Sequence, residues 1–167
     1  MSRDVGEAYL AEALRVFRQY KELGERAMAQ LEPAGLFQTL DEESNGIAVI
    51  VKHMGGNMRS RWTDFLTTDG EKPGRDRDSE FELTASTTGA DVRRWWDQGW
   101  RCVFAALEPL RPDDLLRTVT IRGEPHTVLQ AIDRQVAHYA YHVGQIVLLA
   151  KHLTGERWQT LSVPKRR

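Results

Sequence analysis

The sequence predicts an all-α protein, a four-helix bundle with long crossover connections, from three observations. Its 167 residues are 41% hydrophobic and 28% charged, which is ordinary for one globular domain of this length. Apolar residues recur at steps of three and four in four segments, the period of an amphipathic helix. Two of the intervening segments are long, as in bundles whose successive helices are joined by a crossover. We therefore expect a single domain over residues 1–167, with helices at about 5–31, 44–66, 88–107 and 127–153.

The first two helices are predicted from their apolar stripes. In the first, the stripe consists of Leu10, Ala13, Phe17, Tyr20, Gly24, Ala27 and Leu31. Pro33 cannot continue a helix and is expected to end this one. In the second, the stripe consists of Ile47, Val51, Met54, Met58, Trp62 and Phe65.

The last two helices are predicted in the same way. The third carries Val92, Trp96, Gly99, Val103 and Ala106 and is followed by Pro109 and Pro112. The fourth has the most regular stripe, formed by Val128, Ile132, Val136, Tyr139, Val143, Ile146 and Ala150. Gly155 follows it as a helix stop. Trp96 and Trp100 fall on the apolar side of the third helix, where we expect core packing, with a dimer interface or substrate stacking as alternatives.

The two long connections differ in character. Residues 67–87 are polar and rich in turn formers, and predict a crossover between bundle ends or a functional loop. The charged run at 75–78 within it is typical of a solvated loop, with a lid over a site as the alternative. Residues 118–121 alternate between polar and apolar and precede a turn sequence at 122–124, which indicates a short strand or hairpin.

Composition excludes several classes of protein. The chain has 23 basic and 24 acidic residues, interspersed, so it lacks the positive footprint of a nucleic-acid or membrane-surface binder. Cys102 is the only cysteine, which excludes an internal disulfide and a thiolate metal cage. No uncharged apolar run approaches the roughly 20 residues that span a bilayer, and the first residues lack an apolar signal core. We therefore expect a cytoplasmic protein that binds neither nucleic acid nor membrane.

Two histidines of the fourth predicted helix, His138 and His142, are four residues apart. This spacing places them on one face with Cβ atoms roughly 6 Å apart, so both rings can reach one ion. Alone, the pair could equally be a hydrogen-bonded couple on a partly exposed face. His126 is expected in a loop or capping position before the helix. His152 lies about 15 Å further along the axis and cannot share the ion.

His53 occupies a matching position at the edge of the second helix's apolar stripe, with Asn57 and Arg61 one and two turns later. Such a polar strip on the core side is costly unless each group has a partner. Alone, His53 would more often be a satisfied histidine near the core edge. If the strip faces the fourth helix, His53 supplies a third ligand. Together with His138 and His142 it predicts a site for one divalent metal ion.

Other familiar metal sites are excluded by the residues present. The segment HYAYH lacks the glutamate of a zinc protease, and Gln135 and Tyr139 stand where a di-iron bundle needs glutamates. There is no Gly-rich phosphate loop and no Ser-centred elbow. Three neutral histidines without a balancing carboxylate leave the ion its double charge. That favours an anionic fourth ligand, such as hydroxide or a substrate thiolate.

The two segments that carry these histidines resemble one protein family. IAVIVKHMGGNM at 47–58 is similar to the second helix of the DinB/YfiT-like superfamily, the damage-inducible proteins of bacteria, and HYAYHVGQI at 138–146 to its last helix. Residues 59–66 and 75–82 resemble an uncharacterised branch, and the likeness covers nearly the whole chain. The resemblance implies a DinB-like four-helix bundle, frequently dimeric, with zinc or nickel bound by a histidine triad. It maps that triad onto His53, His138 and His142. Characterised relatives include S-transferases and isomerases that use low-molecular-weight thiols such as bacillithiol, mycothiol or glutathione.

The leading hypothesis is a metal-dependent S-transferase or hydrolase, in which zinc or nickel activates a bound thiol or water. Asn57, Arg61 and Gln145 are the candidates for orienting a ligand or contacting a small-molecule substrate. One alternative is a non-catalytic metal-binding or stress-response module. Another is a helical dimer in which the triad is a hydrogen-bonded relic. A homodimer is expected from the resemblance alone.

Overall fold

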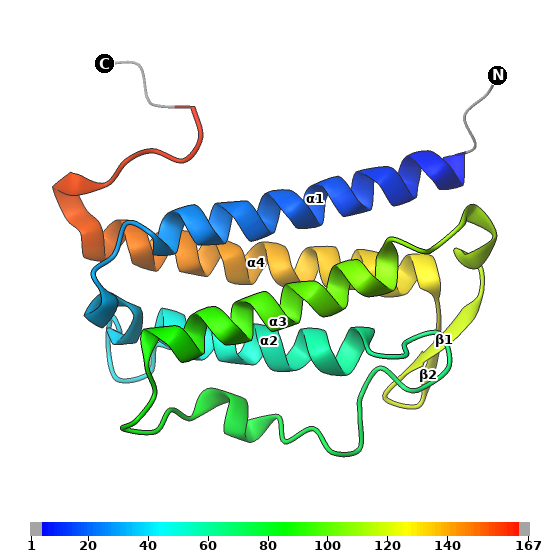
Figure 1. Ribbon diagram of the computed structural model, residues 1–167, viewed down its shortest axis with the longest axis horizontal. Helices are drawn as coiled ribbons and strands as arrows, with labels where there is room; N and C mark the ends of the chain where they lie inside the picture. The colour runs from blue at the N-terminus through cyan, green and yellow to red at the C-terminus, as the bar shows by residue number, and fades with distance from the viewer. Residues whose placement is uncertain (1–4, 164–167) are drawn as a thin grey trace.

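The computed structural model describes residues 5–163, and this part of the chain is mostly helical (Figure 1). Its four α-helices are α1 (Val5–Met28), α2 (Ile47–Trp62), α3 (Gly89–Leu107) and α4 (Val128–Thr154). Helices α3 and α4 begin and end within one residue of their predicted bounds. None of the described helices combines the length and apolar character that crossing a bilayer requires.

Helices α1 and α2 are shorter than predicted, because local turns compete with their ends. The segment before α2 forms a turn in which Asp41 Oδ1 accepts hydrogen bonds from the backbone N–H groups of Glu43 and Ser44. The predicted start near Ser44 is therefore wrong, and α2 begins at Ile47. At its other end Thr63 is extended and Asp64 adopts a left-handed φ of 48°, which ends the helix before Phe65. Helix α1 ends at Met28, and a 3-10 helix, η1 (Pro33–Phe37), follows it.

Helices α3 and α4 have well-defined ends because their capping residues are local. Thr88 and Asp91 form a reciprocal capping box at the start of α3, and Thr127 and Gln130 form one at the start of α4. Gly155 ends α4 with a positive φ of 59°. These caps are readable in the sequence, which explains why the predicted bounds hold.

A β-hairpin precedes α4, as the sequence indicates. Strands β1 (Thr118–Ile121) and β2 (Glu124–Thr127) pair antiparallel. Arg122 and Gly123, with φ values of 57° and 78°, form the two-residue turn between them. His126 pairs with Val119 in β2 and directly precedes Thr127, the N-cap residue of α4, so it lies beside the helix cap and not in a loop.

The connection between α2 and α3 is a long crossover. In Figure 1, α2 and α3 run in the same direction, while α1 and α4 run in the opposite one. Residues 63–88 therefore run back along the outside of α2, from its end to the start of α3. They include the short 3-10 helix η2 (Asp78–Phe81). The predicted crossover is confirmed.

Aromatic side chains fill the centre of the bundle. Trp96 and Trp100 are 2% and 0% exposed, which confirms core packing for both. Trp100 makes edge contacts with Phe17 and Tyr139 at ring-centroid distances of 6.2 and 5.7 Å. Helix α3 approaches α2 closely, since a side chain at Gly99 would lie only 3.0 Å from the α2 backbone. The α2–α3 pair therefore forms a rigid wall behind the residues of the site.

Candidate metal centre

Three histidine rings from two helices converge at one point. His53 lies on α2, and His138 and His142 lie on adjacent turns of α4. The ring centroid of His53 lies 5.6 Å from that of His138 and 5.1 Å from that of His142. The centroids of the two α4 rings are 4.8 Å apart. One nitrogen of each ring lies within 4.8 Å of the others. The structure thus brings together all three residues that the sequence singles out.

A hydrogen-bond acceptor contacts the Nδ1 atom of each ring. Glu80 Oε2 lies 2.9 Å from Nδ1 of His53, and Gln145 Oε1 lies 2.9 Å from that of His142. Gln135 Oε1 makes a longer contact of 3.4 Å with Nδ1 of His138. Because each oxygen accepts, each Nδ1 carries a proton, which leaves Nε2 as the nitrogen of each ring available to bind a metal ion.

Burial keeps the two α4 rings neutral. It lowers the pKa of His138 to about 3, with the neighbouring His142 and His53 rings adding to the effect. It also lowers the pKa of His142 to about 4, against the opposing effect of the Gln145 hydrogen bond. Neutral imidazole is the form that binds a metal. Both rings are therefore ready to act as ligands at neutral pH.

The donor set fits a divalent ion. The Nε2 atom of His142 is buried and has no hydrogen-bond partner among the described residues, a costly arrangement that a bound cation would relieve. Two nitrogens on one zinc ion lie about 3–4 Å apart, because each bond is about 2.0–2.1 Å long. The spacing of up to 4.8 Å therefore needs the rings to close by about 1 Å. Three imidazoles leave at least one coordination position for another ligand.

The acceptor for His53, Glu80, comes from the crossover rather than from a bundle helix. Burial alone would raise the pKa of this carboxyl, but its hydrogen bonds with His53 and Arg75 and the Arg75 charge hold that pKa below its usual value. A methyl group at Gly56 would collide with Glu80 Oε1. Gly56 therefore leaves the space in which the carboxylate reaches the ring.

Arg75 holds Glu80 in place. Its Nε and Nη2 atoms donate to the two oxygens of Glu80, each at 2.8 Å, and its Nη1 donates to Glu71 at 3.0 Å. The Arg75 side chain is only 5% exposed. The expectation that the charged run at 75–78 is simply a solvated loop is therefore wrong for Arg75, although Asp78 is fully solvated. The expectation of a site without a balancing carboxylate is wrong too, since ionised Glu80 contacts His53.

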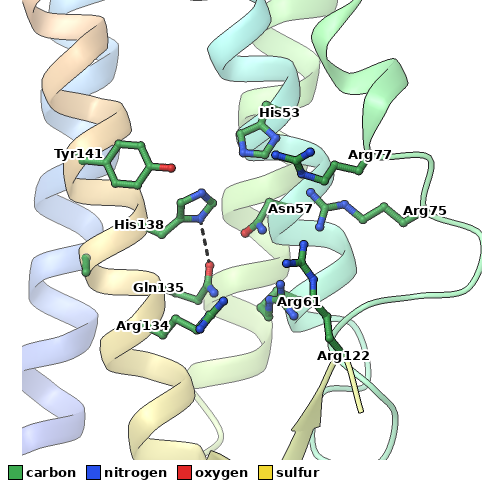
Figure 2. Close-up of a pocket in the computed structure, with 11 residues that line it drawn as sticks. His53, Asn57, Arg61, Arg75, Arg77, Arg122, Arg134, Gln135, His138 and Tyr141 are labelled. Atoms are coloured by element: carbon green, nitrogen blue, oxygen red, sulfur yellow. Dashed lines mark hydrogen bonds between the residues drawn. The ribbon is translucent and has the colours of Figure 1, made fainter. Parts of the chain in front are cut away.

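The candidate residues Asn57, Arg61 and Gln145 lie around this cluster in different ways. Asn57 and Arg61 are 5% and 4% exposed and border a cavity of about 520 Å³ beside the rings (Figure 2). Asn57 Oδ1 accepts a hydrogen bond of 3.2 Å from the buried Tyr139 hydroxyl. Gln145 contacts His142 instead and does not border the cavity.

The cavity opens beside the histidine cluster. His53 and His138 lie opposite each other across it, and the Tyr141 hydroxyl points into it (Figure 2). Arg77 and Tyr141 on its border are each 53% exposed, so the cavity is reachable from solvent. A small molecule can therefore enter beside two of the three rings. His126 and His152 do not belong to the cluster.

Comparison with protein families matches residues 4–167 to one family, described as a protein of unknown function, DUF1572. The chain belongs to the DUF1572 family. The match spans nearly all of the chain, so the histidine cluster and the crossover both lie within this family's sequence. No curated protein matches the chain.

The sequence analysis missed two residues that shape the site. Glu80 and Arg75 belong to a polar connection and to a segment that carries the family resemblance, but nothing in a loop's local sequence indicates which helix it covers. One signal was available, namely the Gly-Gly pair at 55–56 directly after His53. Adjacent glycines inside a helix lower its stability and often mark close contacts.

Proposed function

We propose that this DUF1572 protein is a divalent-metal-dependent enzyme, an S-transferase or hydrolase. The single observation that carries the proposal is the convergence of three imidazoles whose Nδ1 atoms already contact hydrogen-bond acceptors. A metal ion held there would lower the pKa of a bound thiol or water and stabilise the resulting anion. The adjoining cavity gives such a ligand access to two of the rings.

The residues of the chain supply the rest of the proposed chemistry. Glu80 orients His53 and raises the basicity of its Nε2, and the glutamines orient the other two rings. Asn57 has a free amide N–H₂ beside the cavity, since its Oδ1 accepts from Tyr139. We expect this amide to position substrate next to the cluster.

The resemblance to the DinB/YfiT-like superfamily supports the same reading. It implies zinc or nickel as the metal and a low-molecular-weight thiol as one substrate. Histidine suits both ions, so metal availability decides between them as much as affinity does. The thiol and its electrophilic partner belong to the proposal and are to be identified by experiment.

Metal content provides the first test. We expect the purified protein to retain about one equivalent of zinc or nickel and the His142→Ala variant to lose it. His152→Ala is the matched control, because His152 lies on the same helix, is exposed and is outside the cluster. Equal metal content in all three proteins would refute the ligand assignment.

A second test separates an enzyme from a module in which metal serves only structure. Cobalt replaces zinc and reports on its ligands by visible absorption. Addition of glutathione or another low-molecular-weight thiol should change the spectrum if a coordination position is exchangeable. An unchanged spectrum with full cobalt occupancy would favour the non-catalytic alternative.

Dimerisation, which the resemblance implies, remains a proposal of its own. Tyr141 and Leu148 on α4 are 53% and 62% exposed, and the space beside Gly144 between them is open. This face is one on which a second copy could pack. Sedimentation of the wild type beside Leu148→Glu tests it, since a dimer built on this face should dissociate in the variant.

A further inference from the structure

The cavity beside the histidine cluster is bordered by an unusual number of positive charges. Five arginines line it, from α2, the crossover, the hairpin and α4: Arg61, Arg75, Arg77, Arg122 and Arg134. Figure 2 shows their side chains reaching into the same space as the rings of His53 and His138. None of the described residues that line this cavity is acidic.

The carboxylates near the cavity offset only part of this charge. Glu80 is fully engaged with Arg75 and His53. Glu71 is shared by three guanidinium groups, at 3.0 Å from Arg75, 3.0 Å from Arg122 and 3.6 Å from Arg61. Asp78 lies beside Arg77, and Asp69 interacts with the charge of Arg61. Five guanidinium groups thus face four carboxylates, so the region keeps a net positive charge even before a metal binds.

Arg61 is a buried cation with few hydrogen-bond partners. It is 4% exposed, and within the described part of the chain its Nε and Nη1 atoms have no hydrogen-bond partner. Burial lowers its pKa, and the nearby Glu71 only partly opposes that effect. A buried cation with so little compensation is costly unless another anion approaches it.

Arg134 supplies an accessible donor next to it. It lies on α4 four residues before His138, is exposed, and makes no ion pair with any described residue. In Figure 2 its side chain points toward the cavity. Arg77, on the opposite wall, is 53% exposed and contacts only its neighbour Asp78, at 3.7 Å, and the Phe81 ring. Among the described residues Arg134 therefore has no competing partner for a ligand, whereas Arg77 already has two neighbours.

We propose that this cavity is an oxyanion subsite, and that the substrate carries a carboxylate or phosphate group bound by Arg134 beside the buried charge of Arg61. Guanidinium groups present paired N–H donors that match either oxyanion. The placement of the substrate's reacting group at the histidine cluster rests on the proposed function. The anion-binding subsite itself does not.

The spacing along the helices limits the shape of such a substrate. Arg61 follows His53 by two turns of α2, about 12 Å along the axis, and Arg134 precedes His138 by about 6 Å. The anionic group is therefore separate from the reacting group, and several bonds lie between them. A small acid bearing a thiol or an ester at its other end meets this requirement.

Calorimetric titration with two probes, inorganic phosphate and succinate, tests the subsite. The wild type as purified is compared with Arg134→Gln and with Arg101→Gln, a matched control on α3 whose exposed arginine does not border the cavity. We expect Arg134→Gln to weaken binding of the preferred probe about five- to tenfold, as for loss of one charge-assisted contact. Arg101→Gln should bind like the wild type. Whichever probe binds more tightly identifies a phosphate or a carboxylate group.

Absence of saturable binding of either probe, or equal affinity in Arg134→Gln and Arg101→Gln, would overturn the proposal. Thermal unfolding of each variant confirms that it is folded. Metal content is measured in the same samples, so the two proposals fail separately. Anion binding that depends on Arg134 in a protein without metal would support the subsite and refute the metal site. Bound metal in a protein whose anion binding does not depend on Arg134 would support the metal site and refute the subsite.

Discussion

The contact between Glu80 and His53 yields the sharpest prediction, that Glu80→Gln lowers metal affinity while the fold is retained. Glutamine is isosteric and its carbonyl can still accept from Nδ1 of His53. The negative charge that raises the basicity of the ring is lost, however, and so is the two-point contact with Arg75. The variant therefore isolates the charge of Glu80 from its shape.

The magnitude follows from the geometry. A group that orients a metal-binding histidine typically contributes 10- to 100-fold in affinity, about 1.4–2.7 kcal/mol. Removing one partner of a buried ion pair costs about 3–5 kcal/mol of folding free energy. Arg75 is 5% exposed but keeps its contact with Glu71. We therefore expect a loss near the lower end of that range, about 3 kcal/mol.

Two measurements and one control check these values. Competition with a coloured chelator gives the zinc affinity, and urea unfolding of the metal-free protein gives the free energy of unfolding. Glu82→Gln is the matched control, because Glu82 lies two residues further along the same segment and is exposed. It should change neither quantity appreciably.

Equal zinc affinity in the Glu80 and Glu82 variants would refute the reasoning. In that case the charge of Glu80 would not reach the metal through His53, and its contact with the ring would serve only to fix the crossover. A loss of stability without a loss of affinity would lead to the same conclusion.

The remaining predictions use the same geometry. Gly56→Ala places a methyl group against Glu80 Oε1, and it should lower zinc affinity about as much as Glu80→Gln. Gly144→Ala, its control, adds a methyl group in open space on α4. It should leave zinc affinity unchanged and raise the free energy of unfolding in urea by about 0.5–1 kcal/mol. Tyr139→Phe removes the hydroxyl that accepts from the Trp62 indole at 3.0 Å and should cost about 1–3 kcal/mol; an unchanged thermal midpoint would contradict this. In chelator, the folded state binds fewer protons than the unfolded chain, because the pKa values of the α4 histidines lie at about 3 and about 4, below the ordinary value of about 6.5. Stability from these groups is therefore complete above about pH 6.5 and is lost as the pH falls toward 4, and a flat urea-unfolding profile over that range would argue against neutral buried rings.

The parts of the fold that were predictable from sequence are those set by nearby residues. The bounds of α3 and α4 depend on capping residues at fixed offsets, such as Thr88 with Asp91, and these are visible without tertiary information. The start of α2 depends on a turn closed by Asp41, which competes with the helix for the same backbone groups. Periodicity alone overextends such a helix.

The metal cluster was predictable for a similar reason. Two of its members are a fixed helical spacing apart, and His53 lies at the edge of an apolar stripe, so helix packing alone brings the rings together. Glu80 was not predictable in this way. Its position depends on which helix the crossover covers, and that depends on the relative direction of α2 and α3.

Residues 52–56 of α2 contact both the crossover and the histidine cluster. Lys52 donates to the backbone carbonyl groups of Ser79 within η2 and of Glu82 just after it, at 2.6 and 2.7 Å, and so fixes the crossover against the helix. His53 supplies a ring to the cluster, Gly55 allows α3 to approach, and Gly56 leaves room for Glu80. Helices α2 and α3 run in parallel, so a long connection returns along α2. Residues 52–56 hold that connection close to the helix, and there it supports His53 of the histidine cluster. The bundle topology and the candidate site are therefore set by the same residues.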